Sequence, residues 1–238
     1  MTATLDAPTA PTAPTAAAQS EARRALSGAW PVAAFGAAVS TFVFTTLSSN
    51  WLEEGDTRSV ASVYAAVDGD CSKTQLGVVT GFLSVLFLAV FAVGFGRFLA
   101  ARAPQDSAAA QVARLGMNAA VGTVAVAAGL KAVYRGGLPD HMDHTMYTKE
   151  SVAVLQIVVD QYQWAAYWTL ALAMAAVAVL GFKDRVLPKS YAGVSAVAAT
   201  FVLGMTLVLG LPYSSGLIAP VWLVATGIMA LGVRRRLA

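Results

Sequence analysis

Both histidines of the chain lie in one short polar segment, and each directly follows an aspartate: Asp140-His141 and Asp143-His144. Neutral imidazole nitrogens and carboxylates are ligands for Cu, Zn or Ni. One helical turn would place the two histidines on the same face. The segment is therefore a candidate metal site or pH-sensing site, and the alternative is an ordinary solvated loop. A tight metal site would need a further ligand, for which the chain offers Asp68, Asp70 and Cys71.

Polar side chains also recur along one face of an apolar block. Gln156, Asp160, Gln163 and Tyr167 follow the spacing i, i+4, i+7, i+11, which forms one stripe along a helix. Polar groups in a membrane segment are costly without partners, so the stripe should face the inside of a bundle or the interface. Lys131 lies at matching depth and could pair with Asp160. These five residues are candidates for the lining of a ligand cavity; the alternative is an interfacial belt of polar and aromatic residues.

The sequence contains no visible catalytic motif. HExxH, GxSxG and Walker A patterns are absent. No ionisable residue falls near the middle of an apolar block, where a proton-coupled pump would need one. An enzyme acting within the membrane stays an alternative without a catalytic set, and no cofactor is implied beyond the metal ion considered above.

The elements that must position these residues are membrane helices. The chain is 57% hydrophobic and 12% charged, about half the charged share of a soluble domain. A hydrocarbon core of about 30 Å needs about 20 helical residues. The sequence predicts an all-α bundle of six transmembrane helices over residues 25–238 and excludes a soluble globular enzyme. The six spans are expected at about 29–49, 75–98, 112–134, 157–182, 190–211 and 217–233.

Charged residues are distributed unevenly between the two sides of the predicted bundle. With both termini in the cytoplasm, most of the 16 basic residues fall inside and most of the 13 acidic residues fall outside, as the positive-inside rule requires. We therefore expect a multi-pass protein of the cytoplasmic membrane with both termini cytoplasmic. Residues 1–24 contain repeated Pro-Thr-Ala units and are expected to form a disordered tail, because they cannot bury a core.

The sequence predicts helical structure in two polar segments. One lies between the first two spans, and the other lies just before the fourth span. Val60, Val63, Tyr64 and Val67 follow the spacing i, i+3, i+4, i+7, which predicts a short amphipathic helix. We expect it to lie on the outer membrane surface or to cap the bundle. Ser151 is expected to cap the helix that continues into the fourth span.

The third span carries a stripe of small or polar residues that should serve helix packing. Asn118, Gly122, Ala125 and Gly129 lie on one helical face. Small residues allow close approach of helices in lipid. We expect this face to lie against the rest of the bundle.

The last third of the chain shows a pattern of its own. It runs Val-Leu-Pro-Lys at 186–189 after a turn, has Gly193 at the start of an Ala/Val/Leu-rich span, and closes with Gly-Val-Arg-Arg-Arg at 232–236. In these residues it resembles a group of small multi-span bacterial membrane proteins of unknown function. The resemblance implies a bacterial membrane protein and carries no activity.

Two hypotheses on function follow. The first is a non-enzymatic membrane protein that handles or transports a small molecule, or serves as an accessory membrane subunit. The second is an outward-facing metal-binding or pH-sensing protein that uses residues 140–144. The expected partner is the lipid bilayer, with another membrane protein or a second copy of the chain as open alternatives. Nucleic acid is not expected, because the basic residues cluster at the ends of apolar blocks.

Overall fold

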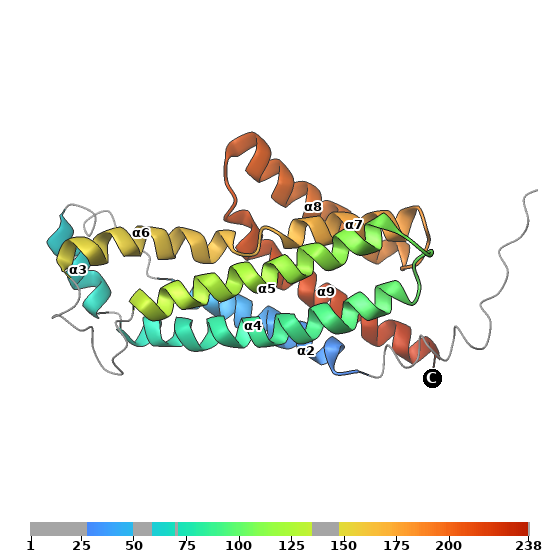
Figure 1. Ribbon diagram of the computed structural model, residues 1–238, viewed down its shortest axis with the longest axis horizontal. Coiled ribbons are helices and arrows are strands. Elements are labelled where there is room, and N and C mark those ends of the chain that lie inside the picture. Colours follow the sequence, from blue (N-terminus) through green and yellow to red (C-terminus); the bar gives the residue numbers. More distant parts are fainter. Residues whose placement is uncertain (1–27, 50–58, 70, 135–147, 238) are drawn as a thin grey trace, which may run out of the picture.

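The structure is a computed structural model that describes residues 28–49, 59–69, 71–134 and 148–237. Within these ranges the secondary structure is helical and contains no strand. Six helical segments of the described chain are long and apolar enough to cross a membrane. The all-α fold class is confirmed, and the protein is a membrane protein (Figure 1). The N-terminal tail expected at residues 1–24 lies outside the described residues.

The spanning segments follow one another along the chain. The first combines α2 (Trp30–Phe42) with a π-helix, η1 (Val43–Leu47). The fourth combines α6 (Lys149–Ala165) with α7 (Leu170–Phe182). The others are single helices: α4 (Cys71–Ala100), α5 (Ala108–Tyr134), α8 (Lys189–Leu209) and α9 (Ser214–Leu237).

Local sequence explains where several helices begin and end. Gly210 follows α8 with a φ of 68°, and Pro212 follows it closely. A glycine in the left-handed region is a common end for a helix. The cap of α6 differs from the prediction: Thr148 is the N-cap, and its Oγ1 accepts a hydrogen bond from the Ser151 backbone N–H at 3.3 Å. The helix starts earlier than expected because Thr148 already has the extended backbone that a cap requires.

The six segments form a bundle with two distinct ends. The start of α2, the end of α9 and the links α4–α5 and α7–α8 lie together at one end (Figure 1). We call it the basic end, because it bears exposed or half-exposed basic side chains. The described members are Arg97, Arg102, Arg114, Lys183, Arg185, Lys189, Arg234 and Arg235. The opposite end carries α3 (Val60–Gly69) and is called the α3 end.

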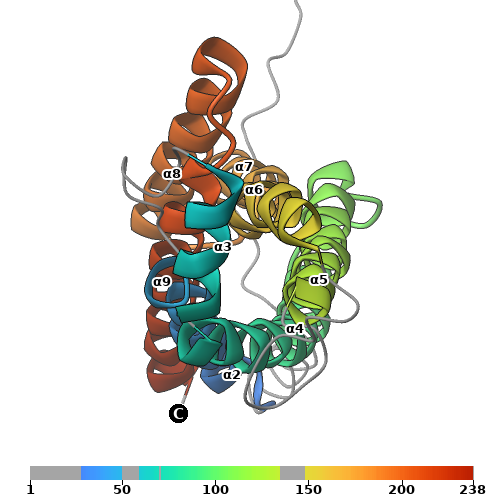
Figure 2. The ribbon, with the colours of Figure 1, turned by 90° about the vertical axis from the view of Figure 1, so that its left-hand side faces the viewer.

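Neighbouring helices enclose a core to which α8 contributes only its first half. α2 packs against α4 and α9, α4 against α5, α5 against α7, and α7 against α8. The far end of α8 projects from the bundle (Figures 1 and 2). Its Leu207 and Val208 are 78% and 79% exposed. Apolar side chains this exposed face lipid in a membrane protein.

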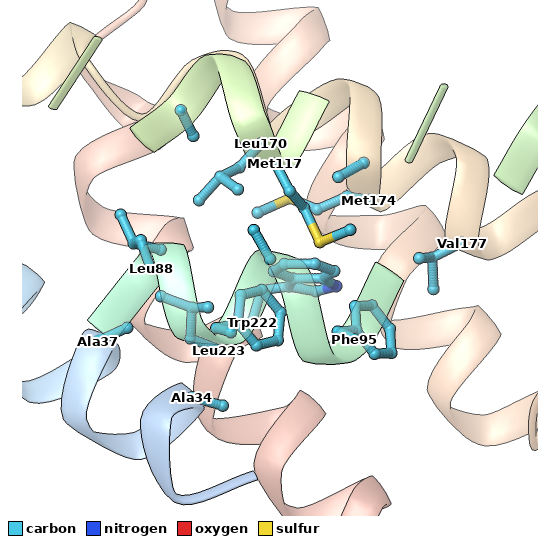
Figure 3. Close-up of a cluster of buried hydrophobic side chains, with 14 of the residues drawn as sticks. Ala34, Ala37, Leu88, Phe95, Met117, Leu170, Met174, Val177, Trp222 and Leu223 are labelled. Atoms are coloured by element: carbon cyan, nitrogen blue, oxygen red, sulfur yellow. The ribbon is translucent and has the colours of Figure 1, made fainter. Parts of the chain in front are cut away.

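The core toward the basic end is dominated by aromatic rings. Trp30 of α2 lies 5.3 Å from Phe95 and 5.5 Å from Phe98 between ring centroids, and Trp222 of α9 meets Phe91 edge-on at 6.1 Å. We call these five residues the aromatic cluster; each is at most 2% exposed. Beside Phe95 and Trp222, Figure 3 shows aliphatic and methionine side chains from α2, α4, α5, α7 and α9 that point toward one another.

The expectation for the small-residue face of the third span is wrong. Asn118 and Gly122 of α5 are exposed, and a Cβ on Gly122 or Gly129 would meet no atom within 4 Å. The covered face is a different one, which buries Met117 and Val124 together with several alanines. Spacing identified a helical face, but the positions of α4 and α7 decided which face is covered.

The short amphipathic helix is present as predicted. α3 packs against α6, and Val67 is buried together with Val152 and Val159. Val63 and Tyr64 are partly buried against this group, whereas Val60 is exposed. α3 therefore packs against the first half of α6, at the α3 end of the bundle (Figure 1).

Candidate functional site

The segment with both histidines, which includes Asp140, His141, Asp143 and His144, lies outside the described residues, as does Asp70. Of the further candidates, Asp68 lies on α3 and Cys71 begins α4. In the described ranges, no group of three or more His, Cys, Asp and Glu residues could hold a metal ion. Binding of Cu, Zn or Ni by residues 140–144 stays a prediction.

Lys131 of α5 is the centre of a buried polar network near the α3 end. Its side chain is only 2% exposed. Its Nζ donates to the Ser48 carbonyl oxygen at 2.5 Å, to Ser48 Oγ at 3.3 Å and to Gln163 Oε1 at 2.9 Å. These oxygens replace water around the amine, which offsets the desolvation cost of several kcal/mol for a buried charge.

The network continues from Gln163 to Asp160 through Ser49. Gln163 Nε2 donates to Ser49 Oγ at 2.8 Å, and Ser49 Oγ donates to Asp160 Oδ1 at 2.9 Å. The direct pair between Lys131 and Asp160 is not formed in the described part of the chain, because Lys131 reaches into the bundle toward Ser48. The two charges are still near enough to attract each other electrostatically. We call these five residues the outer polar network.

Glycine on α4 makes room for the network. A Cβ on Gly77 would lie 2.3 Å from Lys131 Cε and 2.7 Å from Ser48 Oγ. Atoms at these distances overlap, so a larger residue at Gly77 would displace the lysine. The close approach of α4 therefore holds Lys131 in contact with the end of η1.

The remaining two residues of the predicted stripe lie on either side of the network. Gln156 is buried nearer the α3 end, at 3% exposure. Tyr167 is fully buried in the bundle, at the junction of α6 and α7. Asp160, by contrast, is only half-buried. Of the four residues of the stripe, Asp160 is therefore the one that reaches the edge of the bundle.

Two irregular backbone segments lie beside the network, and the sequence did not reveal them. Residues 43–47 form the π-helix η1, and residues 166–169 interrupt the fourth span. Other helices satisfy the carbonyls at the break: Ser215 Oγ donates to Trp164 O at 2.9 Å, and Thr123 Oγ1 donates to Ala166 O at 2.5 Å. Lipid supplies no such donors, so irregular backbone in a membrane depends on these contacts. Both kinds of irregularity are frequent at functional sites.

A cavity of about 590 Å³ adjoins Asp160, between α6, α8 and the start of α9. Its walls are mostly apolar and aromatic, and Asp160 supplies the charged group among the described residues of the lining. Lys131, Gln156, Gln163 and Tyr167 are not part of this lining. The lining consists of Thr46, Asp160, Gln161, Trp164, Phe201, Met205, Leu211, Tyr213, Ser214 and Leu217. Of the five residues predicted to line a cavity, Asp160 therefore does so, and the other four lie elsewhere in the bundle.

The serines of the network were missed by reasoning from the sequence. Ser48 and Ser49 follow Thr45 and Thr46 at the end of the first span. This run of hydroxyl residues at the depth of Lys131 and Asp160 was a usable signal. It was overlooked because hydroxyl groups can satisfy themselves on the preceding helical turn, as Thr45 Oγ1 does on Thr41 O at 2.9 Å.

Comparison with known proteins adds no identity. The chain matches no protein-family model, none of the curated proteins and none of the solved structures with which it was compared. The resemblance of its last third to small bacterial membrane proteins therefore stays an expectation.

Proposed function

We propose that the protein binds a small amphiphilic cation in the cavity beside Asp160 and carries it within or across the membrane. The observation that supports this most directly is the pairing of one carboxylate with aromatic walls. Asp160 lies in the same cavity as Trp164, Phe201 and Tyr213. Aromatic faces attract cations, most strongly where water is excluded, and a carboxylate adds charge complementarity.

In this proposal the outer polar network holds Asp160 ready for a ligand. Ser49 Oγ donates a hydrogen bond to Asp160 Oδ1 at 2.9 Å, and the Gln163 side chain bonds to both Ser49 and Lys131. Lys131 stays behind the cavity wall, so it balances the carboxylate without occupying the binding position. A cationic ligand would then add a second partner to a carboxylate whose orientation is already set.

The binding proposal is tested with tetraphenylphosphonium and its isosteric anion tetraphenylborate. Isothermal titration calorimetry of the detergent-solubilised protein should show saturable binding of the cation only. Asp160→Asn should weaken it about tenfold or more, because a charge-assisted contact is lost. Glu150→Gln is the matched control, since Glu150 is exposed on the first turn of the same helix and outside the cavity lining. Equal affinity in the wild type and Asp160→Asn would remove Asp160 from the proposed site.

Transport is tested separately in proteoliposomes. Uptake of the same cation should exceed that of protein-free vesicles and should fall in Asp160→Asn but not in Glu150→Gln. Binding without uptake would assign the protein a binding or accessory role instead of transport.

We also propose that the basic end faces the cytoplasm of a bacterial cell and that the cavity lies toward the outer half of the membrane. The support is the concentration of basic side chains at the end where α2 begins and α9 ends (Figure 1). Reporters that are active only in the cytosol, fused to either terminus, should both give signal. A silent reporter at one terminus would contradict an even number of crossings with this orientation.

A further inference from the structure

A second polar group lies deeper in the bundle than the outer polar network. Ser40 and Thr41 of α2 are buried, as are Ser84 of α4 and Tyr167. Ser84 Oγ donates to Ser40 Oγ at 3.0 Å. The Tyr167 hydroxyl lies beside Ser84 and Thr41 but does not have the geometry of a hydrogen bond to either. We call these four residues the hydroxyl cluster.

The packing of α2 and η1 against α4 places a phenylalanine between the two polar groups. Nearer the basic end, Ser40 meets Ser84. One turn along, a Cβ on Gly81 would lie 2.9 Å from the ring of Phe44. One further turn toward the α3 end, Ser48 comes close to Gly77 in the same way. Phe44 is fully buried, and Lys131 Nζ lies 5.7 Å from its ring centroid. It therefore separates the hydroxyl cluster from the outer polar network.

The hydroxyl cluster is incompletely satisfied. Within the described part of the chain, neither the Tyr167 hydroxyl nor Thr41 Oγ1 has a hydrogen-bond partner. Both side chains are 0% exposed. Buried polar atoms without partners are rare, and ordered water is a common reason for them.

Another buried tyrosine shows what full satisfaction looks like in this protein. The Tyr191 hydroxyl is 2.6 Å from Thr226 Oγ1, and Thr226 Oγ1 in turn donates to the Trp222 carbonyl oxygen at 2.8 Å. Tyr191 is 5% exposed. The two tyrosines are thus similarly buried and differ in whether the chain itself supplies a partner.

We propose that the hydroxyl cluster is an internal binding site for a neutral hydrogen-bonding molecule of the size of water. Its polar contacts come from Thr41 of α2, Ser84 of α4 and Tyr167 at the junction of α6 and α7. A bound molecule needs two to four such partners. The site is separate from the cavity at Asp160, whose lining contains none of the four residues of the hydroxyl cluster.

Radiolytic hydroxyl-radical labelling of the full-length protein tests the site with water itself as the probe. Radicals formed from a bound water modify adjacent side chains even where bulk solvent is excluded. Tyr167 should be labelled several-fold faster than Tyr191, and Thr41→Val should reduce the labelling of Tyr167. Equal labelling of the two tyrosines would overturn the proposal.

Removal of the hydroxyl gives an independent result with opposite expected signs. If water bonds to Tyr167, Tyr167→Phe should lower the thermal midpoint by about 2–4 °C, as loss of one hydrogen bond would in a chain of this size. If the hydroxyl has no partner at all, the same substitution should leave the midpoint unchanged or raise it, because an uncompensated buried group is removed. An unchanged or raised midpoint overturns the proposal.

Discussion

Lys131→Met is expected to lower the free energy of unfolding by about 3–5 kcal/mol, the typical cost of removing one partner from a buried charge network. Methionine retains the length of the side chain but not the donors to Ser48 and Gln163. Asp160 then loses the opposite charge behind it. Equilibrium unfolding in mixed micelles, followed by circular dichroism, measures the loss.

A double-mutant cycle isolates the electrostatic part of this effect. Lys131→Met combined with Asp160→Asn should cost less than the two single substitutions added together, because no charge is left without its counterpart. Lys149→Met is the control: Lys149 is exposed at the start of α6, and surface charges contribute little. Strictly additive losses in the cycle would show that Lys131 and Asp160 act independently.

Gly116→Val is expected to destabilise the protein by about 3 kcal/mol or more, the upper range for overpacking. Gly116 of α5 faces the break in the fourth span. A Cβ there would lie 2.8 Å from the Thr169 carbonyl oxygen and 2.9 Å from the Ala173 backbone nitrogen. Backbone atoms cannot move aside by a change of rotamer, so α5 and α7 would have to separate. Thermal unfolding in detergent and size-exclusion chromatography measure the result.

Gly122→Val on the same helix separates this clash from the helix propensity of valine. A Cβ at Gly122 would meet no atom within 4 Å, so the same substitution should be nearly neutral. If both variants unfolded at the wild-type temperature, the close packing of α5 against the α6–α7 junction would be refuted.

The membrane helices and the helical face that carries the polar residues could be predicted from the sequence alone. Lipid excludes charged groups, so long uncharged runs indicate helices that can span a membrane. The spacing of Gln156, Asp160, Gln163 and Tyr167 indicates one helical face, because residues three and four positions apart are neighbours on a helix. The α3 helix could also be predicted from the sequence, because the spacing of Val60, Val63, Tyr64 and Val67 places them on one side of a short helix.

The partners of these residues depend on helices far apart in the sequence. Lys131 and Asp160 were expected at matching depth, but only the packing of η1 against α4 and α6 put Ser48 and Ser49, which follow η1, in contact with them. The interruption at residues 166–169 could not be read locally either. Its carbonyls are satisfied by Thr123 and Ser215, which come from two other helices.

By itself, then, the sequence determined that the chain is a bundle of membrane helices and which residues bring polarity into it. These properties depend on each segment's own contact with lipid. Tertiary structure alone decided that Asp160 faces a cavity, that Lys131 stays behind it, and that the covered face of α5 is not the face that carries Asn118 and Gly122. Periodicity defines the faces of a helix, but only the arrangement of its neighbours selects the face that is buried.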